Sequence, residues 1–341
     1  MLDLECTRGF KLDSMKRTLG RSNIEVSALG MGCWAIGGPF WSGDQPLGWG
    51  EVDDTESIRA IHAALEHGVT FFDTADVYGA GHSEIVLGKA LEKRREDVVI
   101  ATKFGNQFDS ITKQTTGSSA SPEYIRSALD ASLKRLGTSY IDLYQFHLGG
   151  NDLTEAALAR DTLEELVATG KIRSYAWSTD DPTRAALFAE GTHCAAVQHT
   201  LNVLEDNSEM LELCQNLNLA SINRGPLAMG LLTGKFSSGT SLQASDVRAK
   251  TPDWMVYFKD GVPNPEWLKK LESVREILTS GGRTLTQGAL AWLWSRSSKT
   301  IPIPGFRTVK QVQENAKALE FGALSERQFL EVEKILRGIK Y

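Results

Sequence analysis

Residues 141–177 read IDLYQFHLGGNDLTEAALARDTLEELVATGKIRSYAW, and this stretch decides the fold class. A short apolar run, Ile141–Phe146, precedes a longer amphipathic segment, Glu155–Thr169, and a second apolar run follows at Ile172–Trp177. Short continuous apolar runs are typical of buried strands, and the longer periodic segment is typical of a helix. The order therefore predicts a strand–helix–strand unit, the building block of a parallel sheet.

The same alternation extends in both directions along the chain. Eight runs are predicted as strands: Leu29–Cys33, Thr70–Asp73, Val98–Thr102, Ile141–Phe146, Ile172–Trp177, Ala195–Gln198, Ala220–Asn223 and Thr300–Ile303. Eight segments are predicted as helices: Thr55–His67, Ser83–Leu91, Pro122–Leu136, Glu155–Thr169, Thr183–Ala189, Met210–Leu217, Leu285–Ser295 and Val309–Leu319. Eight such units without a linker predict a single (β/α)8 TIM barrel. A doubly wound sheet is the alternative, but it needs fewer strands and usually carries a glycine fingerprint near its start.

Four further segments lie outside this repeat. Residues 16–27 predict an N-terminal β-hairpin, whose turn is rich in the residues that accept positive φ. Phe236–Pro265 predicts a long irregular loop, and loops of that length usually serve a function. Ser325–Gly338 predicts an extra capped helix, whereas residues 1–14 form a short extension ahead of a domain spanning residues 15–341.

The composition is that of an ordinary globular protein, with 41% hydrophobic and 23% charged residues among 341. A net charge of -6 disfavours nucleic acid as a partner. The four cysteines show no metal-binding spacing, so we expect free thiols and no metal site. Neither a signal peptide nor a membrane span is predicted, which together with the thiols points to a cytoplasmic protein without a membrane partner.

Polar residues follow three neighbouring predicted strands at the points where these strands end. Asp73 and Tyr78 follow the second strand, Lys103 the third and His147 the fourth. Because the active sites of TIM barrels lie at the carboxyl ends of the strands, we expect these four side chains to share one mouth.

This set suits proton transfer to a carbonyl oxygen. An ammonium such as Lys103 lowers the pKa of a nearby phenol, and a carboxylate such as Asp73 keeps that ammonium charged. Tyr78 would then donate the proton, while His147 orients the same oxygen by a hydrogen bond. The set contains no reductant, which implies a hydride cofactor.

Aromatic side chains gather around the predicted mouth, where their faces suit sugar rings or apolar aldehydes. We therefore predict a substrate pocket lined by Trp34, Trp41, Tyr78, Phe104, His147 and Trp254. For Trp41 the alternative is that it only closes the first loop against the barrel.

Several ordered motifs resemble the aldo-keto reductase superfamily. They are FFDTADVYGAGHSE at residues 71–84, ATKFG at 101–105, DLYQFH at 142–147, SINRGPLAMGLLTGKF at 221–236 and IPIPGFRTVKQVQENAKA at 301–318. The resemblance is nearest to the branch of bacterial general-stress and sugar-related reductases and potassium-channel β subunits. It implies catalytic roles for Asp73, Tyr78, Lys103 and His147.

The resemblance also implies a cofactor site. It assigns to that site Trp34, Ser178, Gln198, Arg224, Gly225, Pro226, Leu227, Gly230, Leu232, Gly234, Lys235, Arg248, Gly305, Phe306, Arg307, Gln311 and Asn315. NADP(H) is favoured, because Arg307 and the helix N-terminus beside it suit a 2′-phosphate. NAD(H) is the alternative, since position 311 is Gln where many members of that family carry Arg.

We therefore expect an NADP(H)-dependent oxidoreductase that reduces a small-molecule aldehyde or ketone, with sugar-derived carbonyls among the candidates. One alternative is a sugar or alcohol dehydrogenase working in the oxidative direction, because the same residues serve both directions. Another is a cofactor-sensing regulatory subunit. The sequence leaves the substrate and the oligomeric state open.

Overall fold

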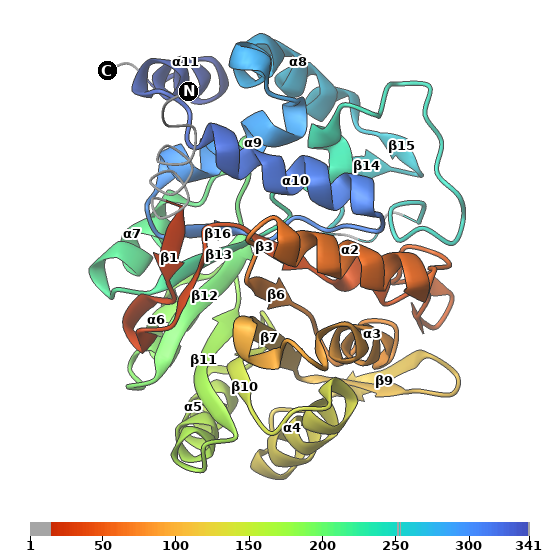
Figure 1. Ribbon diagram of the computed structural model, residues 1–341, viewed down its shortest axis with the longest axis vertical. Helices are drawn as coiled ribbons and strands as arrows, with labels where there is room; N and C mark the ends of the chain where they lie inside the picture. Colours follow the sequence, from red (N-terminus) through yellow and green to blue (C-terminus); the bar gives the residue numbers. More distant parts are fainter. Residues whose placement is uncertain (1–14, 251, 253, 340–341) are drawn as a thin grey trace, which may run out of the picture.

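Eight parallel strands form a closed barrel in the computed structural model, which describes residues 15–250, 252 and 254–339 (Figure 1). Within that part of the chain the strands adjoin in the order β3-β6-β7-β10-β11-β12-β13-β16, and every adjoining pair is parallel. Their bounds are β3 Gly30–Gly32, β6 Phe71–Asp73, β7 Val99–Phe104, β10 Ile141–Phe146, β11 Ile172–Ser178, β12 Cys194–Thr200, β13 Ala220–Arg224 and β16 Thr300–Pro302. All eight predicted strands are confirmed.

The sheet closes between its first and last strands. Gly32 at the end of β3 forms a parallel bridge with Gly305, and its N–H donates to the Pro304 carbonyl at 3.0 Å. A Cβ on Gly32 would lie 2.8 Å from the Ile303 carbonyl oxygen, so the two backbones approach this closely only with glycine here. Closure confirms the predicted TIM barrel over the open doubly wound sheet.

The predicted helices lie around the barrel, with α2 and α10 side by side (Figure 1). Their bounds are α2 Asp54–Glu66, α3 His82–Leu91, α4 Pro122–Leu136, α5 Leu153–Ala168, α6 Pro182–Ala189, α7 Ser208–Asn216, α9 Leu285–Arg296 and α10 Val309–Phe321. Local chemistry sets the bounds of α4, for example. The Ser121 hydroxyl accepts the Tyr124 N–H, Pro122 occupies the first helical position, and Gly137 ends the helix at φ 64.

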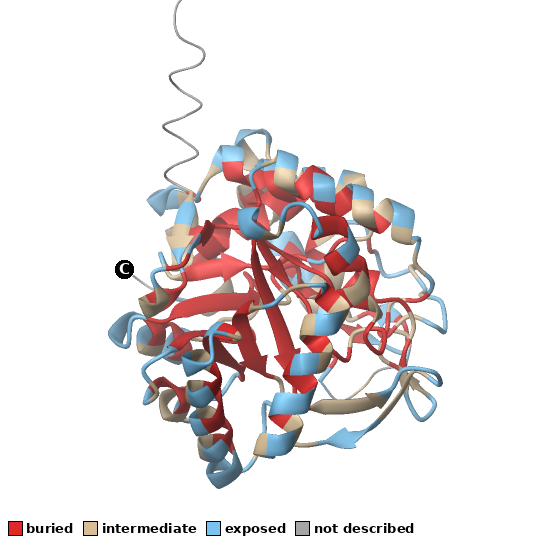
Figure 2. Ribbon diagram, turned by 60° about the horizontal axis from the view of Figure 1, so that its bottom comes forward, coloured by how far each residue is buried: buried red, intermediate tan, exposed pale blue. Residues whose placement is uncertain are grey.

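Two apolar layers hold the barrel together. Figure 2 shows that the barrel strands and the inward sides of the helices are largely buried. The larger fills the space between strands and helices, and the smaller fills the barrel interior. The N-terminal hairpin, β1 Lys16–Thr18 and β2 Glu25–Ser27, is confirmed and contributes Ile24 and Val26 to the interior cluster. The hairpin therefore covers the end of the barrel at which the strands begin.

Some elements were not predicted. β4 Trp41–Ser42 and β5 Gln45–Pro46 pair within the first loop, and β8 Asn106–Asp109 pairs with β9 Gln114–Ser118 after β7. The long late loop contains β14 Phe258–Lys259 and β15 Val262–Pro263 and ends at the helix α8 Pro265–Thr279.

The extra C-terminal helix is confirmed as α11 Glu326–Arg337. Ser325 and Gln328 form a capping box at its start, and Gly338 ends it in the left-handed conformation. The predicted extension, residues 1–14, lies outside the described residues.

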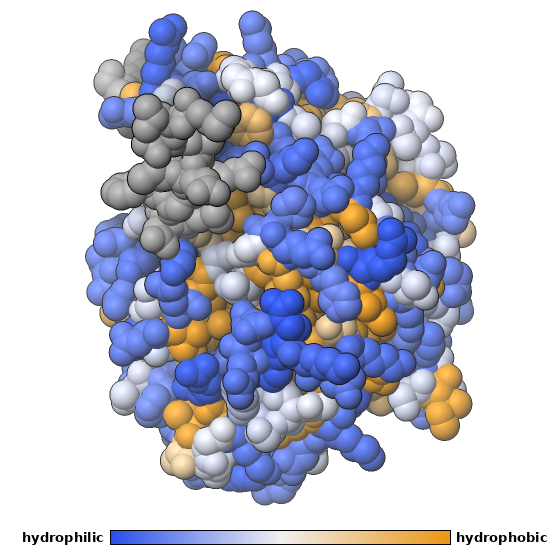
Figure 3. Space-filling view, in the orientation of Figure 1, coloured by the Kyte–Doolittle hydropathy of each residue, from blue (hydrophilic) through white to orange (hydrophobic). Residues whose placement is uncertain are grey.

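The face in Figure 3 is largely hydrophilic, with apolar residues in separate patches. No helix within the described residues combines the length and the apolar character needed to span a bilayer.

Candidate active site

The structure brings Asp73, Tyr78 and Lys103 into direct contact at the carboxyl ends of the strands. Lys103 Nζ lies 2.5 Å from Asp73 Oδ1, 2.7 Å from the Thr74 carbonyl oxygen and 3.4 Å from the Tyr78 hydroxyl. His147 directly follows β10, and its ring meets the Tyr78 ring edge-on with centroids 5.9 Å apart. Three strand ends and one turn therefore meet at one point.

The turn after Tyr78 is fixed by a close backbone contact. Gly79 has φ 62, and a Cβ there would lie 1.8 Å from the carbonyl oxygen of Gly37. Only glycine allows both the positive φ and this approach of the two loops. The loop after β3 thus presses against the turn that carries the phenol.

Burial sets the charge of the phenol and the ammonium. Burial raises the pKa of Tyr78, and the Lys103 ammonium offsets that rise only in part, so the phenol is protonated at neutral pH. Burial, the largest single influence, lowers the pKa of Lys103, but Asp73 and Tyr78 together outweigh it and the pKa lies above its usual range. The sequence correctly predicted that Lys103 lowers the pKa of Tyr78. It did not predict that burial would raise that pKa by more.

His147 is neutral in this setting. Burial lowers the pKa of its imidazole well below the usual range, and Lys103 and Arg224 lower it further. Its Nδ1 is buried with no hydrogen-bond partner within the described structure. A neutral imidazole beside a protonated phenol suits an oxygen atom that accepts hydrogen bonds and gains negative charge.

Aromatic rings form one wall beside Tyr78. The Trp34 ring lies nearly parallel to the Tyr78 ring, with centroids 5.8 Å apart. Trp49 and Trp254 pack against Trp34 at 5.3 and 6.2 Å. Trp254 comes from the late loop and is 51% exposed, so this wall joins the first and the late loops at the mouth.

The other two predicted pocket residues are placed differently. Phe104 is fully buried and stacks on Tyr144 and Phe146 in the layer between strands and helices, which argues against contact with a substrate. Trp41 lies in β4 and pairs with Pro46 and Gln114, consistent with the alternative that it closes the loop.

Ser178 and Gln198 lie next to the group formed by Asp73, Tyr78 and Lys103. They are register partners on β11 and β12, and both are buried. Gln198 Nε2 donates to Asp73 Oδ2 at 2.7 Å. The predicted nicotinamide residues therefore adjoin the predicted catalytic carboxylate.

The glycine-rich segment after β13 contains glycines in the left-handed conformation, and some of its N–H groups already donate to carbonyls within the segment. Gly225 and Gly230 have φ 61 and 92, and a Cβ on Gly225 would meet no atom within 4 Å. The segment also contains Pro226, Leu227, Leu232, Gly234 and Lys235, with Ala228–Thr233 in a short 3-10 stretch. Left-handed glycines let successive N–H groups face a phosphate.

Two basic residues of the predicted cofactor site already have acidic partners, and a third has a lowered pKa. Arg248 pairs with Asp246 at 2.6 Å and donates to the Met229 carbonyl. Arg224 pairs with Asp180. Burial and the nearby Arg248 lower the pKa of Lys235.

The residues predicted for the adenosine end gather between β16 and α10. Gly305 bridges to Gly32, Phe306 is buried, and the Asn315 side chain donates to the Gly305 carbonyl. The Arg307 guanidinium donates to the carbonyl oxygens of Trp49, at 3.0 Å, and Glu51.

The cap of α10 adjoins that guanidinium. The Arg307 backbone N–H donates to Gln311 Oε1 at 2.7 Å, and Thr308 caps α10. A guanidinium, a helix N-terminus and the first loop therefore meet at one place.

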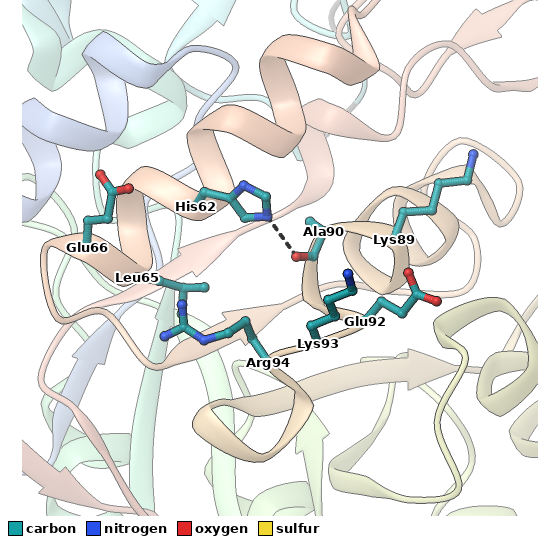
Figure 4. Close-up of a pocket in the computed structure, with 8 residues that line it drawn as sticks. All are labelled: His62, Leu65, Glu66, Lys89, Ala90, Glu92, Lys93 and Arg94. Atoms are coloured by element: carbon teal, nitrogen blue, oxygen red, sulfur yellow. Dashed lines mark hydrogen bonds between the residues drawn. The ribbon is translucent and has the colours of Figure 1, made fainter.

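Two surface cavities lie elsewhere. One of about 400 Å³ lies between α2 and α3, where His62 Nε2 lies 2.8 Å from the Ala90 carbonyl oxygen and charged side chains form the rim (Figure 4). The other, of about 450 Å³, adjoins the N-terminal hairpin. None of the four candidate catalytic residues lines either cavity. The described residues also contain no cluster of His, Cys, Asp and Glu that could hold a metal ion.

Comparison with known proteins gives consistent matches. A model of the aldo/keto reductase family matches residues 28–337. The chain is 31% identical to "Probable aldo-keto reductase 1" of Glycine max over 92% of this chain and 86% of that protein. It is 30% identical to "Aldo-keto reductase yakc [NADP(+)]" of Schizosaccharomyces pombe over 87% and 85%. The solved glycerol dehydrogenase AKR11B4 of Gluconobacter oxydans superposes with a TM-score of 0.79 and 30% identity, covering 95% of both chains.

Proposed function

The chain belongs to the aldo/keto reductase family and is an oxidoreductase, and from that premise we propose that it reduces an aldehyde or ketone to the alcohol with NADP(H). The observation that carries this proposal is the buried contact of Lys103 Nζ with Asp73 and Tyr78 beside a neutral His147. The proposal takes residues 15–341 as one catalytic domain, because candidate residues from all parts of the chain meet at one mouth.

The chain's own residues bind and orient the carbonyl and supply the proton. The nicotinamide, when bound, supplies the hydride. Tyr78 donates its phenolic proton to the carbonyl oxygen as negative charge develops there, and Lys103 stabilises the phenolate that remains. His147 donates a hydrogen bond to the same oxygen, which fixes the face of the carbonyl. Trp34 and its aromatic neighbours exclude water from one side.

The described residues fit a dinucleotide. Ser178 and Gln198 would hold the carboxamide, and the segment 225–235 would hold the pyrophosphate on its backbone N–H groups. Arg307 and the start of α10 would hold the 2′-phosphate that distinguishes NADP from NAD. The relative yakc, whose name carries NADP(+), supports this cofactor.

Oxidation of an alcohol is the second candidate. The similarity to a glycerol dehydrogenase favours it, because that relative's name describes the oxidative direction on a polyol. The same Tyr78, as phenolate, would then accept the proton.

The deciding experiment is a fluorescence titration with NADPH and with NADH, followed by turnover on panels of aldehydes, sugars and polyols. We expect tighter binding of NADPH and turnover of a carbonyl. Binding without turnover of any carbonyl would move the function to polyol oxidation or to the sensing of cofactor. Absence of binding to both cofactors would contradict the proposal.

Replacing Arg307 should weaken NADPH binding selectively. The Arg307→Ala variant loses a charge-assisted contact to the 2′-phosphate, so we expect the Kd for NADPH to rise about 10- to 100-fold. The Kd for NADH should change little, which separates this contact from the loss of the bonds to Trp49 and Glu51. Arg327→Ala, on an exposed position of α11, is the control. An equal loss of affinity for NADPH and NADH would show that Arg307 does not contact the 2′-phosphate.

His147 should show no protonation step in the ordinary histidine range. Its lowered pKa means that kcat for reduction stays level as the pH passes through 6.5, the usual value for histidine. The measurement is kcat between about pH 5.5 and 8 at saturating NADPH. A step near pH 6.5 that disappears in His147→Gln would show that the imidazole is charged in the working enzyme.

A further inference from the structure

Two glutamine side chains hold the free oxygen of the catalytic carboxylate. Gln145 Nε2 donates to Asp73 Oδ2 at 2.8 Å, and Gln198 Nε2 donates to the same oxygen at 2.7 Å. Gln198 Nε2 also lies 3.1 Å from Gln145 Oε1. Lys103 takes the other oxygen, Oδ1. All four side chains are buried, with at most 2% of each residue exposed.

A small residue on the strand between them makes this contact possible. Gln145 lies on β10 and Gln198 on β12, so β11 separates them by two strand spacings, roughly 9–10 Å. Ala176 on β11 is the register partner of Gln145 and belongs to the barrel interior. Its methyl group leaves room for the two amides to meet across the strand.

The two amides change what Asp73 does to Lys103. A buried carboxylate with the ammonium as its only partner would draw that ammonium tightly toward itself. Two neutral donors on Oδ2 share the negative charge and satisfy its lone pairs. The ammonium can then also stabilise negative charge on the Tyr78 hydroxyl oxygen, 3.4 Å away.

Asp73 and Gln145 together fix the amide of Gln198. The Gln198 NH₂ group is directed to Asp73 and to Gln145 Oε1, which leaves its own Oε1 as an acceptor. An acceptor is what the NH₂ group of a nicotinamide carboxamide requires. Asp73 sets which end of Gln198 is offered to the cofactor, and Gln145 reinforces that orientation by accepting the second N–H of the same amide.

We propose that Gln145 is a positioning residue that links the acidity of Tyr78 to the carboxamide subsite through Asp73 and Gln198. This inference rests on the proposed function. Gln145 touches neither the substrate nor the reacting atoms; it acts through its two hydrogen-bonded neighbours.

The test replaces Gln145 by Met, which has a similar length and offers no N–H donor. We follow the pH dependence of kcat for alcohol oxidation, which requires the phenolate, together with that for carbonyl reduction. The ionisable groups that act on Tyr78 or on its partner Lys103 are Cys33, Asp73, Asp76, Lys103, His147 and Arg224. None of them is altered by the substitution.

In Gln145→Met we expect the rise of kcat for alcohol oxidation with pH to occur roughly half to one pH unit higher. Lys103 is then drawn toward Asp73 and stabilises the Tyr78 phenolate less. Reduction at pH 7 should fall about threefold to tenfold for the same reason. If Gln145 had a merely structural role, the substitution would lower both rates at every pH and leave the pH at which oxidation rises unchanged.

A second measurement uses the cofactor. The 3-acetylpyridine analogue of NADP lacks the carboxamide NH₂, so the unaltered protein should bind NADP more tightly than the analogue. Gln145→Met should lose part of that preference, since the Gln198 amide is then held by its bond to Asp73 alone. If the unaltered protein shows no turnover and no NADP binding, the proposed function fails. If the unaltered protein turns over normally and Gln145→Met behaves the same, this inference alone is overturned.

Gln145→Glu serves if Gln145→Met does not fold. It keeps the shape and brings a second carboxyl group to Asp73, so activity should drop at neutral pH and recover as the pH falls and that group gains a proton. A pH profile identical to that of the unaltered protein would overturn the inference.

Discussion

Tyr78→Phe should lower kcat for carbonyl reduction by about 10²- to 10⁴-fold, the usual contribution of a positioned general acid. The phenyl ring keeps the stack on Trp34 and the edge contact with His147, so the shape of the mouth is retained. Only the hydroxyl near Lys103 Nζ is removed. The measurement is single-turnover consumption of NADPH, with the Kd for NADPH expected within about twofold of the unaltered protein.

The matched control is Tyr140→Phe. Tyr140 lies just before β10, at the end of the barrel opposite the mouth, where Arg95 stacks on its ring at 4.0 Å. That variant should keep the rate of the unaltered protein. Near-normal turnover of Tyr78→Phe would show that the proton comes from another group.

Lys103→Met should lower both the catalytic activity and the free energy of unfolding. The ammonium is fully buried and faces Asp73, so its loss leaves a buried carboxylate without a counter-charge, held only by the neutral amides of Gln145 and Gln198. Removing one partner of a buried ion pair costs about 3–5 kcal/mol of the free energy of unfolding. We expect kcat to fall by about 10²-fold or more, because Tyr78 loses the charge that stabilises its phenolate. Urea unfolding and steady-state reduction measure the two effects.

The double variant Asp73→Asn with Lys103→Met separates these effects. It removes both charges, so we expect most of the lost stability to return while the activity remains low. Lys89→Met, at an exposed position of α3, should change neither quantity. Recovery of activity in the double variant would contradict the role assigned to the ammonium.

The sequence determined the barrel, and it placed the four candidate catalytic residues. Apolar runs alternating with amphipathic segments specify strands and helices, because buried strands and half-buried helices have different periods. Once eight such units are found, the polar residues that end neighbouring strands must lie at one mouth. Asp73, Tyr78 and Lys103 therefore followed from their order in the chain, and the structure places them in contact.

Tertiary structure decided which side each side chain of a fully buried strand faces. Every residue of β7, Val99–Phe104, is buried, so the strand shows no alternation of apolar and polar residues from which the face could be read. Phe104 was thus expected at the mouth, although it packs outward beneath the helices. The hairpin after β7 was missed because its strands are short and gain their stability from packing. The helix α8 was missed although Asn264 and Pro265 give its start a local cap signal.

Tertiary structure alone also brought together the network around Asp73. Gln145 and Gln198 are 53 residues apart, and nothing in either segment indicates that they meet. Their contact depends on the strand order of the closed sheet and on the small side chain of Ala176 between them. Local pattern thus specifies the strands and the residues that end them, whereas hydrogen bonds across the barrel interior arise only when closure brings distant strands into register.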